Sequence, residues 1–355
     1  MKNVKVKLNQ NSYEIVFASF NSENFEERFL KLSENRAVLT VGDKKIQQLY
    51  PLMAYRYGKF FALAGGEDNK NLSEIERLCE YGISENLDRK SLFVAIGGGI
   101  TGDMTGFTAA IFMRGVEFIQ VPTTLLAMVD SSVGGKTGVN SASGKNLIGA
   151  FKQPKLVLID VNFLKTLPER EIKNGLAEVI KYAFALDEKF FELLSGNVDK
   201  INSLDLNFYN KIIHRSCEIK ADIVAQDEKE TKNVRALLNY GHTFGHALEN
   251  LSNYEISHGE GVAIGMNIAG KLSQLLNLWS ESDYLKQLKL IKDLNLRYAI
   301  PRNIKIDDIT EVMTHDKKAS RGKINFVLPT AIGSSEVFSN IDMEIVKKAL
   351  EESYE

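Results

Sequence analysis

The sequence predicts an α/β N-terminal domain with a Rossmann-like, largely parallel sheet, followed by a mainly α-helical C-terminal domain. Short apolar runs bounded by Gly, Pro or Asp alternate with helical patterns up to about residue 160. After Leu167 and Pro168, long helical patterns dominate. A chain of 355 residues exceeds one compact core. We therefore expect two domains, 1–161 and 162–355, with an active site in the cleft between them.

Each expected element follows from its own local pattern. The apolar runs predict strands at residues 36–41, 60–64, 92–96, 118–121 and 156–159. A helical rhythm over 71–87 lies between two of these strands, and residues 169–184 place their apolar side chains on one helical face. Late strands are expected only near 324–328 and 336–338.

Composition excludes several classes of function. A formal net charge of −2 gives the chain no basic character, which argues against nucleic acid as a partner. Residues 1–17 carry neither the apolar core of a signal peptide nor a membrane span, so no membrane partner is expected. Cys79 and Cys217 have no metal or redox spacing. A cytoplasmic enzyme fits these observations.

Glycines concentrate in one part of the first domain. Eleven of the 26 glycines fall between Gly97 and Gly149. Residues 97–102 match G-x-G-x-x-G directly after the strand expected at 92–96, where a backbone without Cβ atoms can approach a pyrophosphate. The usual ribose-binding acid is missing, because Glu117 precedes its strand. The turn therefore binds a dinucleotide in a variant Rossmann arrangement, or it has a purely structural use.

A second glycine-rich segment carries basic residues. The sequence around Lys136 resembles a phosphate loop, but Asp130 stands where that motif needs glycine, and we reject it. Lys136, Lys145 and Asn146 lie on glycine-rich segments, with Arg114 upstream. Such a cluster suits a small anionic substrate, although solvated surface lysines would give the same pattern.

Histidines mark the second domain. Arg235, Asn239, His242 and His246 follow at steps of four, three and four residues, which predicts one face of a helix. The residues between them are almost uncharged, as in the wall of a polar cavity. Three of the five histidines, namely His242, His246 and His258, lie within seventeen residues.

Two interpretations of the histidines stay open from the residues alone. A carboxylate and two imidazoles would leave an open position on a divalent ion, as a catalytic metal requires. Alternatively, the pair His242 and His246 belongs to a hydrogen-bonded network. Glu178 is a possible carboxylate donor, but it could equally be an exposed partner of Lys181, three residues later.

Several motifs appear together in a fixed order. They are Gly97-Gly-Gly-Ile-Thr-Gly-Asp103, Met113-Arg-Gly115, Asp130-Ser-Ser-Val-Gly-Gly-Lys136, Gly144-Lys-Asn146, Asn174-Gly-Leu-Ala-Glu178-Val-Ile-Lys181, Asn239-Tyr-Gly-His242-Thr-Phe-Gly-His246 and His258-Gly-Glu-Gly261. Over nearly its whole length, the chain resembles the 3-dehydroquinate synthase family.

The resemblance implies a homodimer with two cofactors. It implies one divalent metal, zinc or cobalt, held by Glu178, His242 and His258, with His246 left in a polar or proton-transfer role. For NAD it implies Asp43, Glu67, Lys70, Gly98, Gly99, Ile100, Thr101, Gly102, Asp103, Thr123, Thr124, Asp130, Lys136, Lys145, Phe163, Leu164, Lys165 and Thr166. For the substrate it implies Asp130, Lys136, Lys145, Asn146, Lys181, Lys220, Arg235, Asn239, one of Lys317 and Lys318, and Arg114 from the neighbouring subunit.

The implied reaction is redox-neutral overall. 3-Deoxy-D-arabino-heptulosonate 7-phosphate would be oxidised transiently at C5 by NAD, lose phosphate, be reduced again, open its ring and close by an intramolecular aldol step to 3-dehydroquinate. Another sugar-phosphate cyclase is the nearest alternative. A metal-dependent polyol dehydrogenase of related fold comes next, and a non-enzymatic dinucleotide-binding relative after it.

Overall fold

The computed structural model describes residues 2–20, 22–319 and 324–354, and the side chains of 315–319 are not described. Contacts divide the chain into two compact units. The first unit contains the residues up to Pro168 together with Ser216–Lys229. The second unit contains Glu169–Arg215 and the residues from Glu230 onward.

The first unit is built on a seven-stranded sheet with the strand order β1-β2-β9-β6-β5-β3-β4. The strands are β1 (Val4–Val6), β2 (Tyr13–Phe17), β3 (Val38–Asp43), β4 (Lys59–Leu63), β5 (Leu92–Gly97), β6 (Glu117–Pro122) and β9 (Leu156–Ile159). Only the edge pair β1 and β2 is antiparallel. Strand β5 is fully buried, which explains its continuous apolar sequence.

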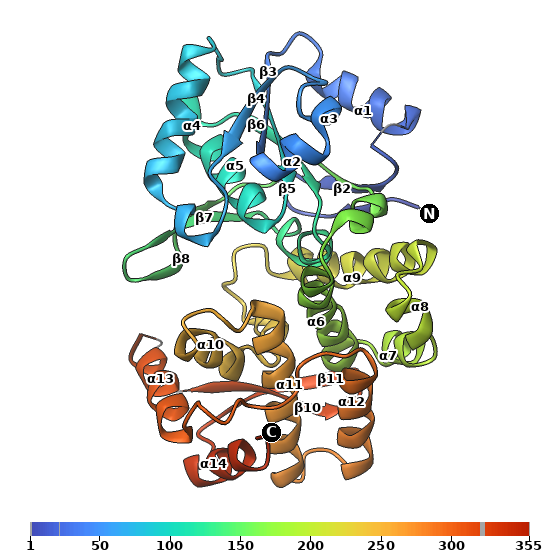
Figure 1. Ribbon diagram of the computed structural model, residues 1–355, viewed down its shortest axis with the longest axis vertical. Coiled ribbons are helices and arrows are strands. Elements are labelled where there is room, and N and C mark those ends of the chain that lie inside the picture. The colour runs from blue at the N-terminus through green and yellow to red at the C-terminus, as the bar shows by residue number, and fades with distance from the viewer. Residues whose placement is uncertain (1, 21, 320–323, 355) are drawn as a thin grey trace. The chain divides into compact units, whose positions relative to one another are not determined.

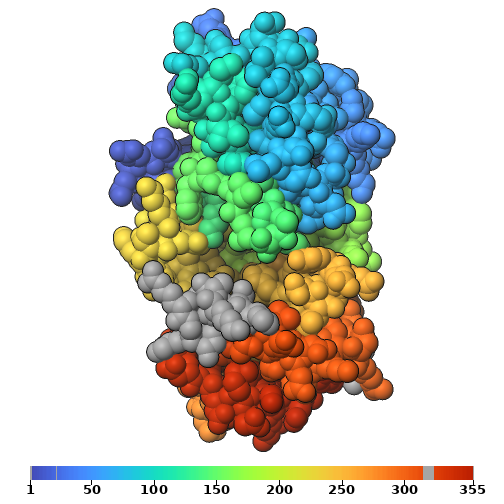
Figure 2. All heavy atoms as spheres, turned by 90° about the vertical axis from the view of Figure 1, so that its left-hand side faces the viewer, coloured from blue at the N-terminus to red at the C-terminus, as the bar shows by residue number. Residues whose placement is uncertain are grey.

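Helices cover this sheet, and a separate hairpin projects from it (Figure 1). The helices are α1 (Glu23–Ser33), α2 (Lys44–Leu49), α3 (Pro51–Ala54), α4 (Leu72–Ser84) and α5 (Gly99–Ile111). Phe93 of β5 and Phe118 of β6 share a buried cluster with Leu78 of α4 and Met104 of α5. The hairpin of β7 (Lys136–Ser141) and β8 (Gly144–Phe151) exposes much of β8 at the surface of the unit (Figure 1 and Figure 2).

The second unit is mainly helical. Its helices are α6 (Glu169–Leu186), α7 (Glu188–Ser195), α8 (Val198–Asn202), the start of α9 (Leu206–Gln226), α10 (His242–Leu251), α11 (His258–Leu275), α12 (Glu281–Asp293), α13 (Ile306–Ala319) and α14 (Met343–Glu351). An antiparallel pair, β10 (Asn325–Ala331) and β11 (Ser334–Ser339), completes it. Helix α11 is buried over most of its length, because α6, α10, α12 and α14 all pack against it.

The predicted fold class is confirmed, and the predicted strands and helices appear close to their expected bounds. The structure adds β1, β2 and the β7–β8 hairpin, which the sequence patterns did not identify. The expected domains 1–161 and 162–355 differ from the contact-based units in two places. Residues 162–168 and Ser216–Lys229, which includes the end of α9, belong with the first unit.

The expected helix from Arg235 to His246 is interrupted. Val234–Asn239 forms a 3-10 helix, and α10 starts only at His242. Between them, Gly241 has φ of +78°, a left-handed conformation that ends one helix and starts the next. The prediction that Arg235 and Asn239 share one helical face with the histidines is therefore wrong. Local spacing could not show that the chain turns here.

Candidate metal centre and cofactor-binding residues

Three helices meet at the candidate metal centre, and close backbone packing brings two of them together. A Cβ atom on Gly265 of α11 would lie 1.9 Å from the carbonyl oxygen of Gly241. One turn away, a Cβ atom on Gly245 of α10 would lie 2.8 Å from the carbonyl oxygen of Gly261. Only glycine permits this approach. It brings His242, the first residue of α10, close to the start of α11 at His258.

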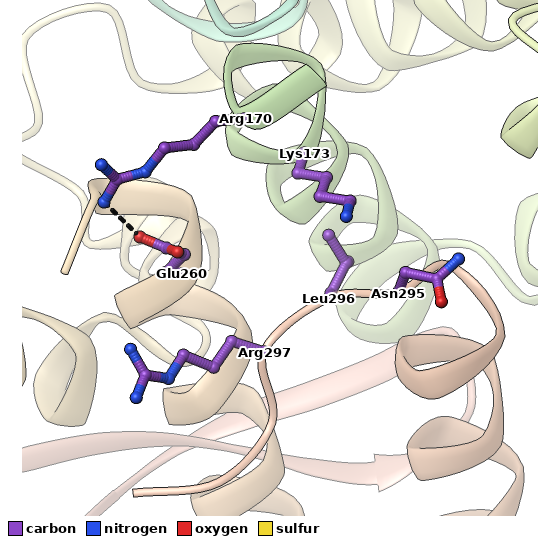
Figure 3. A pocket seen from close by; sticks show the side chains of 6 residues that line it. All are labelled: Arg170, Lys173, Glu260, Asn295, Leu296 and Arg297. Atoms are coloured by element: carbon purple, nitrogen blue, oxygen red, sulfur yellow. Dashed lines mark hydrogen bonds and ion pairs between the residues drawn. The ribbon is translucent and has the colours of Figure 1, made fainter. Parts of the chain in front are cut away.

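The first turn of α11 is also fixed against α6. The side chain of Asn174 accepts a hydrogen bond from the backbone N–H of Gly259 at 2.5 Å. Nearby, Arg170 donates to a carboxylate oxygen of Glu260 at 2.8 Å (Figure 3). Asn174 lies one turn before Glu178 on α6, and Gly259 directly follows His258. These contacts set the carboxylate of α6 opposite the imidazole of α11.

One carboxylate and two imidazoles converge at this point. Glu178 Oε1 lies 3.6 Å from His242 Nε2 and 3.4 Å from His258 Nε2. Donor atoms of the three residues all lie within 4.8 Å of one another. Glu178 is fully buried, so the alternative of an exposed carboxylate is wrong, whereas its pairing with Lys181 is confirmed. This donor set is one that zinc accepts in catalytic sites.

Each histidine is oriented from the far side of its ring. His242 Nδ1 lies 3.1 Å from the carbonyl oxygen of Tyr240, and His258 Nδ1 lies 3.1 Å from Glu249 Oε1. Both partners can only accept, so each Nδ1 carries a proton, and Nε2 is the nitrogen of each ring that faces Glu178. The arrangement is typical of metal-binding histidines, whose second nitrogen is anchored by an acceptor.

The electrostatics of the two imidazoles differ. Burial, reinforced by the Lys181 ammonium, holds the pKa of His242 well below its usual value, so this ring stays neutral. Burial also opposes charge on His258, but hydrogen bonds to Glu178 and Glu249 overcome it and raise its pKa to about 10. The centre therefore favours positive charge next to its carboxylates, which a cation would supply.

His246 lies beside the three converging residues. Its ring centroid is 5.2 Å from that of His242 and 6.1 Å from that of His258. Together with Glu249 and His258 it forms a second group with the geometry of a possible metal site. His246 is thus a neighbour of the converging set, and its side chain is exposed.

In the first unit, a buried lysine connects the glycine-rich turn to the hairpin. Lys70 Nζ donates to Asp103 Oδ2 at 2.6 Å and to Asn146 Oδ1 at 2.5 Å. The backbone N–H of Asn146 donates to Asn140 Oδ1, and the Asn140 amide donates to Glu67 Oε1 at 2.8 Å. Burial raises the pKa of Asp103, although the Lys70 ammonium opposes this shift. Four residues predicted from the resemblance, Glu67, Lys70, Asp103 and Asn146, therefore belong to one network.

The glycine-rich turn itself joins β5 to α5. Gly98 precedes α5, which begins at Gly99, so the turn opens a helix as the sequence predicted. A Cβ atom on Gly97 would lie 2.5 Å from Thr101 Oγ1, which explains the tight turn. The backbone N–H of Thr123 donates to the Gly97 carbonyl at 2.9 Å. Amide groups at the start of α5 suit an anionic ligand.

Other predicted cofactor residues lie at or shortly after the carboxyl ends of strands β3 and β9. Asp43 ends β3 and caps α2, accepting from the Ile46 N–H at 2.8 Å. Phe163 and Thr166 belong to the short helix Val161–Thr166, where Thr166 Oγ1 lies 2.6 Å from the hydroxyl of Tyr50. The ends of parallel strands at one edge of a sheet are where such folds bind ligands.

The structure distributes the predicted substrate residues between the units. In the first unit, Lys220 donates to Asp130 Oδ1 at 2.7 Å, Lys136 starts β7 and Lys145 lies on β8. Arg114 is exposed and has a left-handed backbone with φ of +68°.

In the second unit, Arg235 is buried, and its Nη1 atom lies 3.7 Å from Glu230 Oε1. Asn239 is exposed. The predicted contacts of Lys317 and Lys318 fall on side chains outside the described part of the structure.

Sequence reasoning missed the residues that support the metal centre. The sequence patterns assign no role to Asn174, which only belongs to one of the motifs, and they do not include Glu249. Glu249 lies seven residues after His242, hence on the same side of α10, which is the one signal that could have found it. A cavity of about 240 Å³ is lined by residues that were also not predicted: Arg170, Lys173, Glu260, Asn295, Leu296 and Arg297 (Figure 3).

Solved structures with this fold define a class of enzyme. The chain is similar to 2-deoxy-scyllo-inosose synthase complexed with carbaglucose-6-phosphate, NAD+ and Co2+, at 27% identity and a TM-score of 0.87, covering 99% of this chain and 100% of the other. It is also similar to 2-epi-5-epi-valiolone synthase from Streptomyces hygroscopicus with NAD+ and Zn2+ bound, at 25% identity and a TM-score of 0.86, covering 98% of each chain. The fold is that of the sugar-phosphate cyclases.

Sequence comparisons identify the family within this class. Family models described as 3-dehydroquinate synthase N-terminal and C-terminal match residues 60–174 and 175–319. A 3-dehydroquinate synthase of Rippkaea orientalis is 44% identical over 357 residues, covering 98% of this chain and 97% of that protein. The chain belongs to the 3-dehydroquinate synthase family. Among its described residues, no helix has the length and apolar character needed to span a membrane.

Proposed function

We propose that the protein converts 3-deoxy-D-arabino-heptulosonate 7-phosphate to 3-dehydroquinate and phosphate. The observation that carries this proposal is the convergence of Glu178, His242 and His258 in a chain of this family. It is a lyase, since a C–O bond to phosphate is broken without net oxidation. A polyol dehydrogenase of related fold would have little use for the basic residues Lys136 and Lys145 on β7 and β8.

Two cofactors complete the proposal. Glu178, His242 and His258 would hold zinc or cobalt, and the glycine-rich turn with Lys70 and Asp103 would hold NAD. When bound, NAD stores and returns a hydride while the divalent ion stabilises negative charge on substrate oxygens. The related structures that contain NAD+ with Zn2+ or Co2+ support this assignment.

The basic residues bind the two anionic ends of the substrate. Lys145 with Lys136 holds the phosphate, and Arg235 with Asn239 holds the carboxylate. A guanidinium matches a carboxylate with two parallel hydrogen bonds, and the burial of Arg235 strengthens this interaction. Holding both ends limits the conformations of the open-chain intermediate before ring closure.

Two residues are placed to handle charge and protons near the reacting carbons. Lys181 is buried and forms an ion pair with Glu178, so its side chain balances the charge of this carboxylate and offers a donor to a substrate oxygen. His246 is exposed beside His242 and can exchange a proton with solvent. We also propose a cytoplasmic homodimer in which Arg114 reaches the substrate phosphate of the neighbouring subunit.

Phosphate release tests the proposal directly. The protein with substoichiometric NAD and zinc should release one phosphate per heptulosonate phosphate, form 3-dehydroquinate and accumulate no NADH. Treatment with a chelator should abolish turnover, and zinc or cobalt should restore it. Net NADH formation would favour a dehydrogenase, and phosphate release with a different carbocycle would favour another cyclase.

A further inference from the structure

The two histidines of the metal centre are anchored by different kinds of acceptor. A backbone carbonyl, that of Tyr240, faces His242 Nδ1 at 3.1 Å. A carboxylate, that of Glu249, faces His258 Nδ1 at the same distance. A charged acceptor makes a stronger hydrogen bond than a neutral one and increases electron density on the opposite nitrogen. The difference points to a specific task for Glu249.

Glu249 is built into its position. It lies on α10 with only 6% of its surface exposed, and burying a carboxylate is unfavourable unless it has partners. Gly261 of α11 makes room for it, because a Cβ atom there would lie 3.2 Å from Glu249 Cγ. Gly261 is also the residue one turn after His258. The helix pair thus leaves a gap through which the carboxylate reaches the imidazole.

We infer that Glu249 is a positioning residue that holds His258 in the tautomer and orientation needed to bind the divalent ion. A neutral imidazole has one N–H and one lone pair. Nε2 faces the centre, 3.4 Å from Glu178 Oε1, and must offer its lone pair when it binds an ion. Nδ1 is then the nitrogen that carries the hydrogen, and it donates to Glu249. In this role Glu249 acts through His258 and is not itself a ligand of the ion. This inference rests on the metal centre of the proposed function.

The second donor group, His246 with Glu249 and His258, offers a rival explanation. In it, Glu249 would bind a second cation directly. That arrangement would require His258 to present lone pairs on both nitrogens, which a neutral imidazole cannot do. The positioning role is therefore the simpler use of the same three residues, and the number of bound ions distinguishes the two.

Metal affinity tests the inference without reference to turnover. Apo-protein would be titrated with Zn2+ against a chromophoric chelator, and with Co2+ while its visible spectrum is recorded. Glu249→Ala should weaken binding by about 10- to 100-fold and alter the Co2+ spectrum, with one ion still bound per chain. Glu249→Gln, which keeps an oxygen acceptor but loses the charge, should weaken binding less. Glu255→Gln is the matched control, because it removes the same charge from an exposed position near α11.

Specific results would overturn the inference. Unchanged Zn2+ affinity in both Glu249 variants would remove the positioning role. The rival second site would be established if the wild type bound two ions per chain and Glu249→Ala bound one ion with unchanged affinity. Should Glu249→Ala fail to fold, as judged by thermal unfolding of the apo-protein, Glu249→Gln still decides the question. Glu178→Ala separates this inference from the proposed function, since unchanged affinity in that variant would remove the metal centre itself.

Discussion

The two units arrange their charged side chains differently. In the second unit, Glu178, His242 and His258 point their donor atoms at one another, and acceptors behind the rings hold the histidines in place. In the first unit, Lys70 is paired with Asp103 and Lys220 with Asp130. The second unit also contains an ion pair, between Lys181 and Glu178, but there the carboxylate faces two imidazoles as well.

This difference follows from what each region is proposed to bind. A divalent ion requires donor atoms at fixed distances and angles, so its site must be assembled in advance. A phosphate or a dinucleotide is larger and is bound by several groups, each of which can exchange a carboxylate partner for the ligand. Rigid placement matters in the second unit, and the release of existing partners matters in the first.

The largest effect is expected at the carboxylate of the metal centre. Glu178→Gln should remove the bound ion and lower kcat/KM by roughly three orders of magnitude or more, because the ion stabilises charge that no side chain replaces. Metal content and phosphate release measure this. Added zinc should restore chelator-treated wild type but not the variant. Full activity in the Glu178→Gln variant without bound metal would contradict the proposal that the metal centre of the second unit is required for turnover.

The anion-binding residues should show intermediate effects. Lys145→Ala and Arg235→Ala should each lower kcat/KM about 10- to 150-fold, the equivalent of a charged hydrogen bond of roughly 1.5–3 kcal/mol. Steady-state kinetics with the heptulosonate phosphate checks this, and Zn2+ affinity serves as the control that should not change. If both variants keep the wild-type kcat/KM, the assignment of these residues to the substrate is lost.

The packing of α10 against α11 gives the next prediction. Gly265→Ala places a methyl group 1.9 Å from the Gly241 carbonyl oxygen, so the helices must separate. The free energy of unfolding should fall by about 1–3 kcal/mol, and Zn2+ affinity should fall with it. Gly196→Ala, at a helix end with an ordinary negative φ of −79°, is the matched control. Denaturant unfolding measures the change, and unaltered stability with unaltered affinity would contradict the role given to this contact.

The smallest effect is expected for the ion pairs of the first unit. Asp103→Asn and Lys70→Met should each weaken NAD binding, and the double variant should differ from the sum of the singles by about 0.5–1 kcal/mol. Calorimetric titration with NAD measures the affinities of the wild type, the two single variants and the double variant. Exact additivity would show that the pair in the ligand-free protein has no bearing on cofactor binding.

Much of the fold was predictable because buried parallel strands have a local signature. The apolar runs at β3, β5, β6 and β9 were found within a few residues of their ends. Strands β1 and β2 were missed because they are short and because β2 is stabilised by pairing with a strand distant in sequence, β9, while β1 pairs with β2. Residues 216–229 belong to the first unit because of contacts with residues distant in sequence, and local sequence patterns do not show such contacts.

By itself, the sequence determined the class of fold, the glycine-rich turn after β5, and the set of residues able to bind a metal. These depend on local periodicity and on residue types in order along the chain. Tertiary structure alone decided which donors converge, that Glu178 is buried, that the chain turns at Gly241, and that Glu249 supports His258. The reason is physical: burial and hydrogen bonding at each residue depend on helices that are distant in sequence and packed within contact distance.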